Sequence, residues 1–441
     1  MRSLLRFLLF SGAFAAGAFA QQPGATVAAT ATVKLTLDEA LKRAKKNDVT
    51  YQASVTNSGL AHEDRVQARD ALLPSVAYNN SYIYTQGTGR GDNSVRFIAN
   101  NAVHEYISQG NVHEFIDVAT IADWRRASAN AAAARARAQI AARGLVVTVV
   151  QTYYAAAAAQ EKVLSSQNAA DEGERFFKLT QDLEHGGEVA HSDVIKAELQ
   201  ERERLRQLQE ARLALLNARL DLAVLVFPDF NDSFEIADDL HAAISLPTFD
   251  ETKELAAREN PEIRAALESL KAAGNEVTSA RAGYLPGLSL DYFYGIDAAH
   301  FASRTDGVPN LGSSVVATVN IPVWNWGATQ SRVRQAQLQR DQSKRELSFT
   351  QRKLIAELHG LYAEAETSSN ELASLARSAE LSKESLRLIT LRYKDGESTV
   401  LEVVDAQATS TSADAAYHDG ALRYRVALAN LQTLTGVLTT P

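Results

Sequence analysis

In four stretches of the chain, apolar and polar side chains alternate, as expected for a β-strand with one apolar face. In the second half, apolar residues recur at every second position from Leu288 to Tyr294 and again from Val315 to Val323. In the first half, one face of residues 74–85 carries Val, Tyr, Asn, Tyr and Tyr. A fourth stretch, roughly Val112–Ile121, alternates poorly. The pattern predicts two strands in each half, and the fourth strand is the least well defined.

Between these strands the sequence allows very long helices. None of the nine prolines lies between residues 75 and 227 or between 323 and 440. The segment Trp124–Glu184 would form a helix of 61 residues, about 90 Å long. The helix that follows carries a heptad seam with small residues at alternate layers. An ordinary amphipathic helix packed on a core is the alternative reading of that seam. Its positions are Leu208, Leu215 and Leu222 with Ala211, Ala218 and Leu225, and they recur 209 residues later at Tyr417, Tyr424 and Leu431 with Gly420, Ala427 and Leu434.

The two halves of the chain repeat one another. A period near 200 residues is too long for a solenoid and indicates two copies of one supersecondary unit. Each copy reads as a capped helix, a strand, a loop, a second strand and a long helical hairpin. Counted from Trp124 and Trp326 to the turn glycines, the outgoing helix is one heptad longer in the second copy. The matching motifs are Thr36-Leu37-Asp38-Glu39 with Thr248-Phe249-Asp250-Glu251, Leu73-Pro74 with Leu285-Pro286, Asp123-Trp124 with Asn325-Trp326, and Gly187-Glu188 with Gly396-Glu397.

The start of the chain has the features of a secretory signal peptide, residues 1–20. Arg2 and Arg6 precede an apolar run, and Ala18-Phe19-Ala20 has the form of a cleavage site. A short membrane anchor is the alternative, but the run is shorter than the roughly 20 residues that a spanning helix needs. The remaining predicted divisions are a linker at 21–34, a first repeat at 35–235, a linker at 236–247, a second repeat at 248–436 and a tail at 437–441.

Composition excludes several classes of function. The chain has no cysteine, so disulfides, thiol catalysis and thiolate metal sites are excluded. The formal net charge is −8 and becomes −10 when Arg2 and Arg6 leave with the signal peptide, which argues against nucleic acid as a partner. No stretch after the signal approaches 20 apolar residues. If the mature chain meets a bilayer, it must therefore do so as strands.

The alternating strands suit a membrane barrel with lipid outside and water inside. Four strands cannot close, because open edges in lipid would leave backbone groups unpaired. Two chains would give eight strands and a filled interior, whereas three would give twelve and a channel. Trp124, Trp324 and Trp326 stand near the predicted strand-to-helix joints, as expected for aromatic residues at a membrane interface. A soluble antiparallel sheet would look similar strand by strand.

The mature chain resembles the TolC-type outer membrane efflux proteins. The resemblance implies a homotrimer, in which a 12-stranded β-barrel in the outer membrane continues into a periplasmic α-barrel of coiled-coil hairpins. It also implies an export duct that works with a periplasmic adaptor (membrane fusion) protein and an inner-membrane transporter. Many members of that family carry a lipidated N-terminal cysteine, which this chain lacks. The residues that carry the resemblance are Leu37-Asp38-Glu39-Ala40, Phe249-Asp250-Glu251, Asn260-Pro261, the two Leu-Pro pairs, Ile321-Pro322-Val323-Trp324-Asn325-Trp326-Gly327, Tyr393-Lys394-Asp395-Gly396-Glu397-Ser398 and Val403-Val404-Asp405-Ala406-Gln407.

The same resemblance implies roles for residues near the helical turns. The turns at Gly187 and Gly396 would form the periplasmic entrance and dock the adaptor. Glu402 and Asp405 match acidic residues that narrow it, and three chains would bring six carboxylates around one axis. A solvated helix face is the alternative. Two positions of the lock that holds the entrance closed are matched by Tyr393 and Asp193. At the third, Ser398 replaces an arginine and cannot supply a charged fork.

Two other clusters have simpler explanations. His104-Glu105 and His113-Glu114 are near-duplicates that could hold a metal, but residues of a duplicated hairpin tip are the preferred interpretation. The arginines at 125, 126, 135 and 137 are interpreted as solvated helix faces near the membrane, with contact to anionic lipid as the alternative.

The sequence therefore predicts an outer membrane channel of a tripartite efflux system for small molecules. The first alternative is the exit duct of a type I protein secretion system, and the second is a soluble periplasmic coiled-coil scaffold. No nucleophile–base arrangement, cofactor motif or metal site is predicted, so an enzyme is not expected. A channel wall carries no substrate pocket, and the sequence does not name a cargo.

Overall fold

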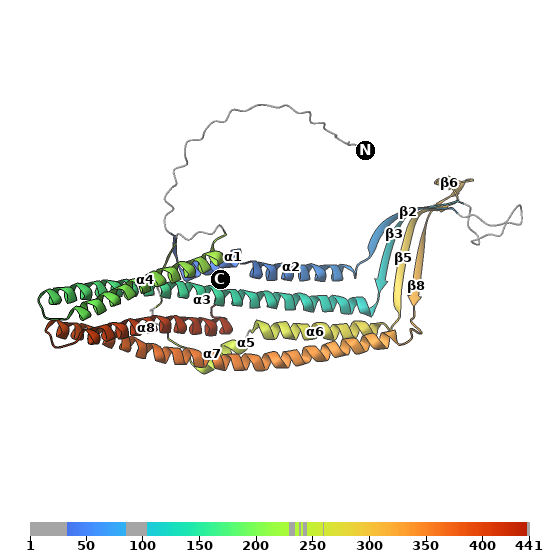
Figure 1. Ribbon diagram of the computed structural model, residues 1–441. Helices are drawn as coiled ribbons and strands as arrows, with labels where there is room; N and C mark the ends of the chain where they lie inside the picture. Colours follow the sequence, from blue (N-terminus) through green and yellow to red (C-terminus); the bar gives the residue numbers. More distant parts are fainter. Residues whose placement is uncertain are drawn as a thin grey trace, which may run out of the picture.

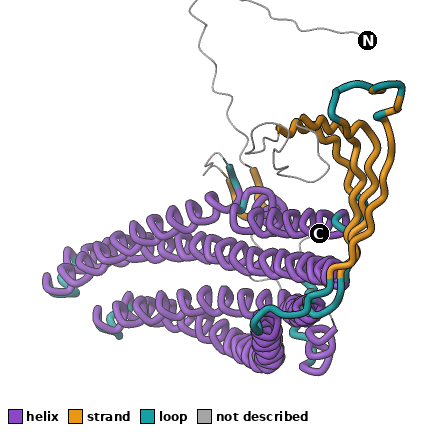
Figure 2. Tube along the Cα trace, turned by 90° about the vertical axis from the view of Figure 1, so that its right-hand side faces the viewer, coloured by secondary structure: helices purple, strands orange, loops and turns teal. Residues whose placement is uncertain are grey.

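The computed structural model describes residues 33–84, 104–228, 234–237, 240, 245–258 and 260–438. The predicted signal peptide, most of the first predicted linker and half of the second lie outside these residues. The chain forms a long bundle of helices with a sheet at one end (Figure 1). Turned by 90°, the sheet rises away from the end of the bundle as one curved layer (Figure 2).

The two halves of the chain present the same large elements in the same order. The first half contains α1 (Leu37–Asn47), α2 (Val49–Asp70), β2 (Ser75–Tyr84), β3 (His104–Ile116), α3 (Val118–His185) and α4 (His191–Val226). The second contains α5 (Phe249–Arg258), α6 (Pro261–Ala282), β5 (Gly287–Ala298), β8 (Leu311–Asn320), α7 (Ala328–Lys394) and α8 (Val400–Thr435). Short strands complete the fold: β1 (Val33–Leu35), β4 (Phe234–Ile236), β6 (Arg304–Thr305) and β7 (Val308–Pro309).

Side-chain capping explains where several helices begin. Thr36 accepts a hydrogen bond from the Glu39 N–H at 3.3 Å and opens α1. Thr248 and Glu251 form the reciprocal pair before α5, with bonds of 3.1 and 3.4 Å. Both threonines satisfy N–H groups that the first helical turn leaves free. The two predicted helix starts are therefore confirmed. The prediction of a single helix from each start to the Leu-Pro pair is wrong, because Asp48 and Asn260 each cap a second helix, α2 and α6.

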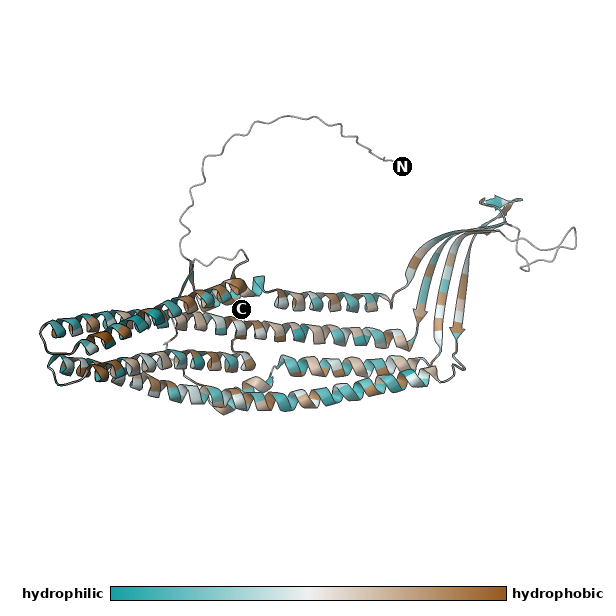
Figure 3. Cartoon of the chain, in the orientation of Figure 1, coloured by the Kyte–Doolittle hydropathy of each residue, from teal (hydrophilic) through white to brown (hydrophobic). Residues whose placement is uncertain are grey.

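The sheet joins the strands of both repeats in the order β2-β3-β5-β8, with every neighbouring pair antiparallel. Its register aligns Val76, Val112, Tyr292 and Val315 in one row. Because side chains alternate between faces, this row places the predicted apolar positions that lie within the strands on one face of the sheet. The predicted end of the last strand at Val323 is wrong, since β8 ends at Asn320 and Ile321 and Val323 follow it. Figure 3 shows hydrophobic and hydrophilic residues alternating along the strands. Within one chain, β2 and β8 remain edge strands.

The predicted limits of the fourth strand, Val112–Ile121, are wrong. The strand is β3 and ends at Ile116, and Asp117 then caps α3 by accepting a bond of 2.7 Å from the Thr120 N–H. The weak alternation of the predicted stretch has a local cause. Glu114 lies on the same face as Val112, Phe115 lies on the opposite face, and the residues from Asp117 onward belong to the cap and to α3.

The predicted one-heptad difference between the long helices is also wrong. α3 has 68 residues and α7 has 67. The comparison of Trp124 with Trp326 caused the error, because Trp124 lies inside the second turn of α3 whereas Trp326 precedes α7. The structural counterpart of the α7 cap, Gly327, is Asp117, 210 residues earlier.

Helices of the two repeats pack side by side along the bundle. α3 packs against α2, α4, α6 and α8, and α7 packs against α6 and α8. A large apolar core near the middle of the bundle surrounds Tyr153, whose hydroxyl donates to the carbonyls of Leu35 at 3.3 Å and Ala237 at 2.7 Å. These bonds fasten the small parallel pair β1–β4 to α3. The predicted seam residues are all buried or half-buried, among them Leu208, Leu222, Tyr424 and Leu431.

In the described parts of the chain, one helix contains a window that is long and apolar enough to cross a membrane by length and composition. That helix is α3, and 44% of the window is buried inside the fold. The composition of the sequence did not suggest such a window. Buried apolar residues of α3, such as Val149 and Val150, belong to the core around Tyr153, so packing between helices is an explanation for the apolar character of this helix.

Candidate functional site

The two turns that join the long helices have the same geometry. Gly187 and Gly396 both have φ of +76°, a left-handed conformation that favours glycine. In each turn the glycine N–H donates three residues back, and the next residue, Glu188 or Glu397, donates five residues back to a helix carbonyl, at 2.9 Å in both cases. This arrangement closes helix ends by satisfying their free carbonyls. The repeat is thus preserved in backbone detail at the end of the bundle far from the sheet (Figure 1).

A compact apolar cluster holds the two hairpins together behind these turns. It contains Phe176 from α3, Ala197 from α4, Tyr393 from α7 and Val403 from α8. The rings of Phe176 and Tyr393 have their centres 5.2 Å apart. The turns therefore form one packed unit, and the side chains on it keep fixed positions relative to one another.

Glu402 belongs to a capping arrangement at the start of α8. Its N–H donates to Thr399 Oγ1 at 3.4 Å, and its carboxylate accepts from Thr399 Oγ1 at 3.2 Å and Ser398 Oγ at 2.8 Å. These hydrogen bonds lower the pKa of the Glu402 carboxyl below its ordinary value. The single chain thus shifts this pKa in the direction opposite to the one expected for a ring of carboxylates. Asp405 lies one turn further on and is exposed.

Only part of the predicted lock comes together. Tyr393 is 3% exposed, and its hydroxyl donates to Thr180 Oγ1 at 3.5 Å. Burial raises the pKa of Tyr393, and the negative charge of Asp193 adds to the effect, so these two side chains are electrostatic neighbours. Asp193 itself pairs with Lys196 at 3.3 Å. The Ser398 hydroxyl instead donates a hydrogen bond to the Glu402 carboxylate.

The three tryptophans are not equivalent. Trp324 and Trp326 are 75% and 89% exposed at the joint between β8 and α7, and their rings meet edge to face at 5.8 Å. Trp124 is half-buried within α3, so its predicted place at a strand-to-helix joint is wrong. The helix starts six residues earlier than the sequence suggested, at Val118.

The histidine and arginine clusters also have structural explanations. His104 and His113 both lie on β3, nine residues and about 30 Å apart, and an odd spacing puts them on opposite faces. They cannot share a metal, and they do not form a duplicated hairpin tip. His113 pairs instead with Asp291 on the polar face at 2.8 Å. Arg126 pairs with Glu276, and Arg137 donates to Ser269 at 3.2 Å, so two of the arginines tie α3 to α6 rather than being merely solvated.

Two buried polar residues between the hairpins were missed in the sequence. Asp414 of α8 accepts from Ser165 of α3 and pairs with Lys383 of α7 at 2.6 Å, and His418 Nε2 lies 3.7 Å away. These donors lower the pKa of Asp414 strongly. Arg204 of α4 is buried as well. A signal was present, because Arg204 lies seven residues before Ala211 on the predicted seam.

Comparisons with known proteins agree with this architecture. The alkaline protease secretion protein AprF of Pseudomonas aeruginosa is 24% identical over 416 residues, covering 90% of this chain and 83% of AprF. The outer membrane protein TolC of Escherichia coli is 21% identical, covering 91% of this chain and 82% of TolC. The solved structure of the outer-membrane channel OprN has a TM-score of 0.80 at 19% identity and covers 92% of this chain and 91% of OprN. The family description "Outer membrane efflux protein" matches residues 253–437. Residues 253–437 therefore belong to the outer membrane efflux protein family, and the chain as a whole is similar to outer membrane secretion and channel proteins.

Proposed function

We propose that the protein is the outer membrane channel of a tripartite efflux system, a trimeric duct from the periplasm to the exterior for small molecules. The observation that carries the proposal is the sheet. Its four strands, drawn from both repeats, share one apolar face and leave β2 and β8 unpaired within the chain. Such a sheet is stable in lipid only when its edges are closed by other copies. Three copies would supply a 12-stranded barrel with a lumen.

In this proposal the helices continue the barrel as a periplasmic tunnel. The half-buried seam on α4 and its counterpart on α8 support a wall of coiled-coil hairpins. A cleaved signal peptide at residues 1–20 would direct the chain across the inner membrane. The exposed Trp324 and Trp326 would mark the membrane interface on the tunnel side of the barrel. The repeat limits 35–235 and 248–436 remain predictions.

The turns would form the periplasmic end of the duct. Gly187 and Gly396 would present the surface that a periplasmic adaptor contacts, with an inner-membrane transporter beyond it. Asp405 and Glu402 lie one turn apart on α8, so three chains would place six carboxylates around the entrance. Tyr393 and Asp193 would contribute to closing it, whereas Ser398 is already engaged with Glu402 and supplies no positive charge.

A specific observation favours a second candidate, the exit duct of a type I protein secretion system. AprF and PrtF, both named as protease secretion proteins, align with 90% and 91% of this chain. OprJ, named only as an outer membrane protein, aligns with 39% of it. The two candidates share the same duct and differ in cargo and partners. Comparing export of a protease with export of a small dye in cells that carry each pump would separate them.

Recordings from the purified protein in planar bilayers test the duct and its entrance together. The parent should conduct, and multivalent cations added on the periplasmic side should block the current. The double variant Glu402→Ala with Asp405→Ala should conduct but lose most of that block, because the carboxylates that attract cations are gone. The double variant Glu397→Ala with Glu188→Ala, which removes acids from the turns themselves, is the matched control. Absence of any conductance would refute the channel, whereas an unchanged block would refute only the acidic entrance.

A further inference from the structure

A cavity of about 400 Å³ lies between the two helical hairpins, toward the end of the bundle that carries the turns. All four long helices line it, and Arg204 of α4 and Gln407 of α8 are the two buried residues on which its chemistry depends. We propose that this cavity binds a small carboxylate that carries a neighbouring O–H or N–H group, such as a hydroxy acid or an amino acid. The ligand would bridge the first and second repeats.

Arg204 is a buried cation without a carboxylate partner. It is 4% exposed, and within the described residues it makes no ion pair. Its guanidinium donates to Gln207 Oε1 at 2.9 Å, and the Gln200 amide oxygen, in the orientation that satisfies both groups, accepts from it at 2.8 and 3.1 Å. Three of its five N–H groups are thus used on neutral amides. Burial lowers the pKa of Arg204, while the charges of Glu203 and Glu172 oppose that effect without forming an ion pair with its guanidinium in the described residues.

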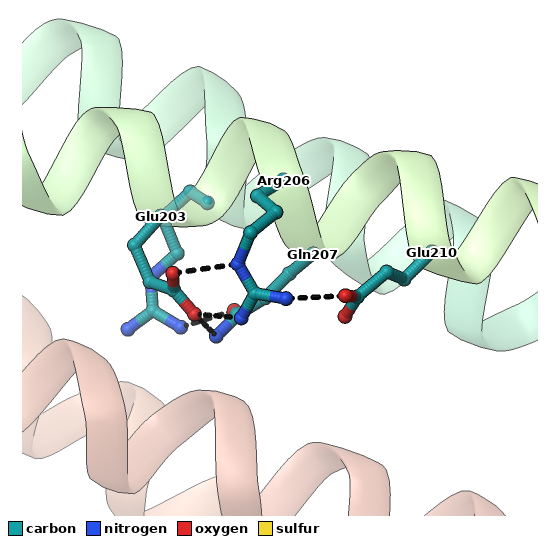
Figure 4. Close-up of polar contacts among 5 residues, drawn as sticks. Glu203, Arg206, Gln207 and Glu210 are labelled. Carbon is teal, nitrogen blue, oxygen red and sulfur yellow. Dashed lines mark hydrogen bonds and ion pairs between the residues drawn. The ribbon is translucent and has the colours of Figure 1, made fainter.

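The acidic residue nearest in sequence is already engaged elsewhere. Glu203 accepts from Arg206 Nε and Gln207 Nε2, each at 2.9 Å, and Arg206 reaches on to Glu210 (Figure 4). Packing keeps Arg204 in place on the other side, because Gly173 of α3 leaves room for its stem. A Cβ at Gly173 would stand 3.4 Å from Arg204 Cγ. An external carboxylate is therefore the group that would complete the surroundings of Arg204.

Gln407 is the second buried group that the ligand would satisfy. It is 5% exposed, and its Oε1 has no hydrogen-bond partner among the described residues. A buried carbonyl oxygen without a donor costs about 1–3 kcal/mol. A ligand with an O–H or N–H beside its carboxylate would satisfy Gln407 and Arg204 at once. A carboxylate alone would satisfy only Arg204.

The remaining charges of the lining favour an anion. Asp414 is held by Lys383 and Ser165, and Arg387 is held by Glu384. The lining residues that remain are the cations Arg204 and Lys394 and the anion Glu172, so the cavity has an excess of one positive charge. The volume exceeds that of one water, about 30 Å³. The space and charge therefore suit a small organic anion better than a single ordered water.

Ligand-observed NMR on the purified full-length protein in detergent tests the proposal, with glycolate and acetate as probes. Glycolate should bind and acetate should bind more weakly, since acetate lacks the hydroxyl donor. Arg204→Gln should weaken glycolate binding about tenfold, as expected for loss of a hydrogen bond to a charged group. Arg202→Gln, on the same helix but exposed and paired with Glu198, should leave binding unchanged.

A second variant keeps the test decisive if Arg204→Gln fails to fold. Gln407→Met keeps the shape of the side chain and removes the carbonyl oxygen. It should lower glycolate affinity to that of acetate and leave acetate unchanged. Glycolate binding that is absent from the parent, or that is equally strong in both variants, would overturn the proposal. None of these outcomes depends on conductance, so the site and the channel can fail separately.

Discussion

Polar residues at buried heptad positions determine much of the chemistry of this chain at the scale of the residue. Along α8, Val400, Gln407, Asp414, Ala421 and Leu428 recur every seven residues, and all five are buried. The apolar members at the two ends pack the hairpins, while Gln407 and Asp414 interrupt that packing midway. A polar group in such a seam costs stability unless it is paired, and it fixes register when it is. Asp414 has its partners on both neighbouring helices, whereas Gln407 Oε1 has none among the described residues.

Glu402 yields a prediction about stability and pH. Its folded-state pKa is lowered by Ser398 and Thr399, so the stabilisation is present above the ordinary glutamate pKa and is lost as pH falls through the lowered value. Glu402→Ala should lower the melting temperature near neutral pH by about 1–2 °C. The difference between variant and parent should vanish in strong acid, where both lack the charged carboxylate. Thermal denaturation of both proteins at the two pH values measures it.

The matched control for this prediction is Glu397→Ala. Glu397 is exposed in the same turn, and its carboxylate makes no hydrogen bond within the described residues. Its variant should melt like the parent at both pH values. A Glu402→Ala protein that is destabilised equally in acid would mean that lost packing, and not the hydrogen-bonded charge, is responsible.

At the scale of the element, local signals in the sequence located most of the fold. Proline-free windows, capping threonines and turn glycines are short-range features, and they located the long helices, the starts of α1 and α5, and both turns. The errors arose where the deciding interaction was equally local but less distinctive. The Asp117 cap started α3 before Trp124, and Glu114 on the face of Val112 masked the alternation of β3. The Asp414 cluster depends on three helices meeting, and no local pattern gives that geometry.

Two double variants of the turn glycines separate the effect of backbone strain from the effect of side-chain size. A Cβ at Gly187 or Gly396 would have nothing within 4 Å, so a large side chain there projects into open space within one chain. The double variant Gly187→Trp with Gly396→Trp should abolish export while leaving insertion into the outer membrane intact. The double alanine variant carries the same strain of positive φ, about 1–2 kcal/mol per site, and should keep most of the activity. Dye efflux in cells measures both.

The comparison between the two variants decides the interpretation. Loss of export in both would show that the turns act through their backbone conformation. Full export in the tryptophan variant would place the adaptor-docking surface elsewhere on the bundle.

At the scale of the whole molecule, both the sheet and the helical bundle of a single chain leave surfaces uncovered. The strands β2 and β8 expose nearly every side chain and leave one row of backbone groups unpaired. The helix α2 has no buried residue at all, although it carries Val49, Val55 and Leu60 on its surface. Both features lie on outer elements of the chain (Figure 1). A neighbouring copy on each side would cover strand edges and helix faces together.

Proline substitutions in β8 test this closure directly. Along an edge strand, successive N–H groups point alternately toward the partner strand and away from it, so one of the two residues Val315 and Val316 directs its N–H outward. Proline at the outward position is harmless on a true edge but breaks a ladder bond when another strand is paired there. If β8 pairs with β2 of a neighbouring copy, Val315→Pro and Val316→Pro should each destabilise the assembly. Native mass spectrometry in detergent should then show a trimer for the parent and for the matching alanine variants, and mostly dissociated chains for both proline variants. A parent that is mainly monomeric or dimeric, or one proline variant that remains fully trimeric, would contradict a barrel closed through β8.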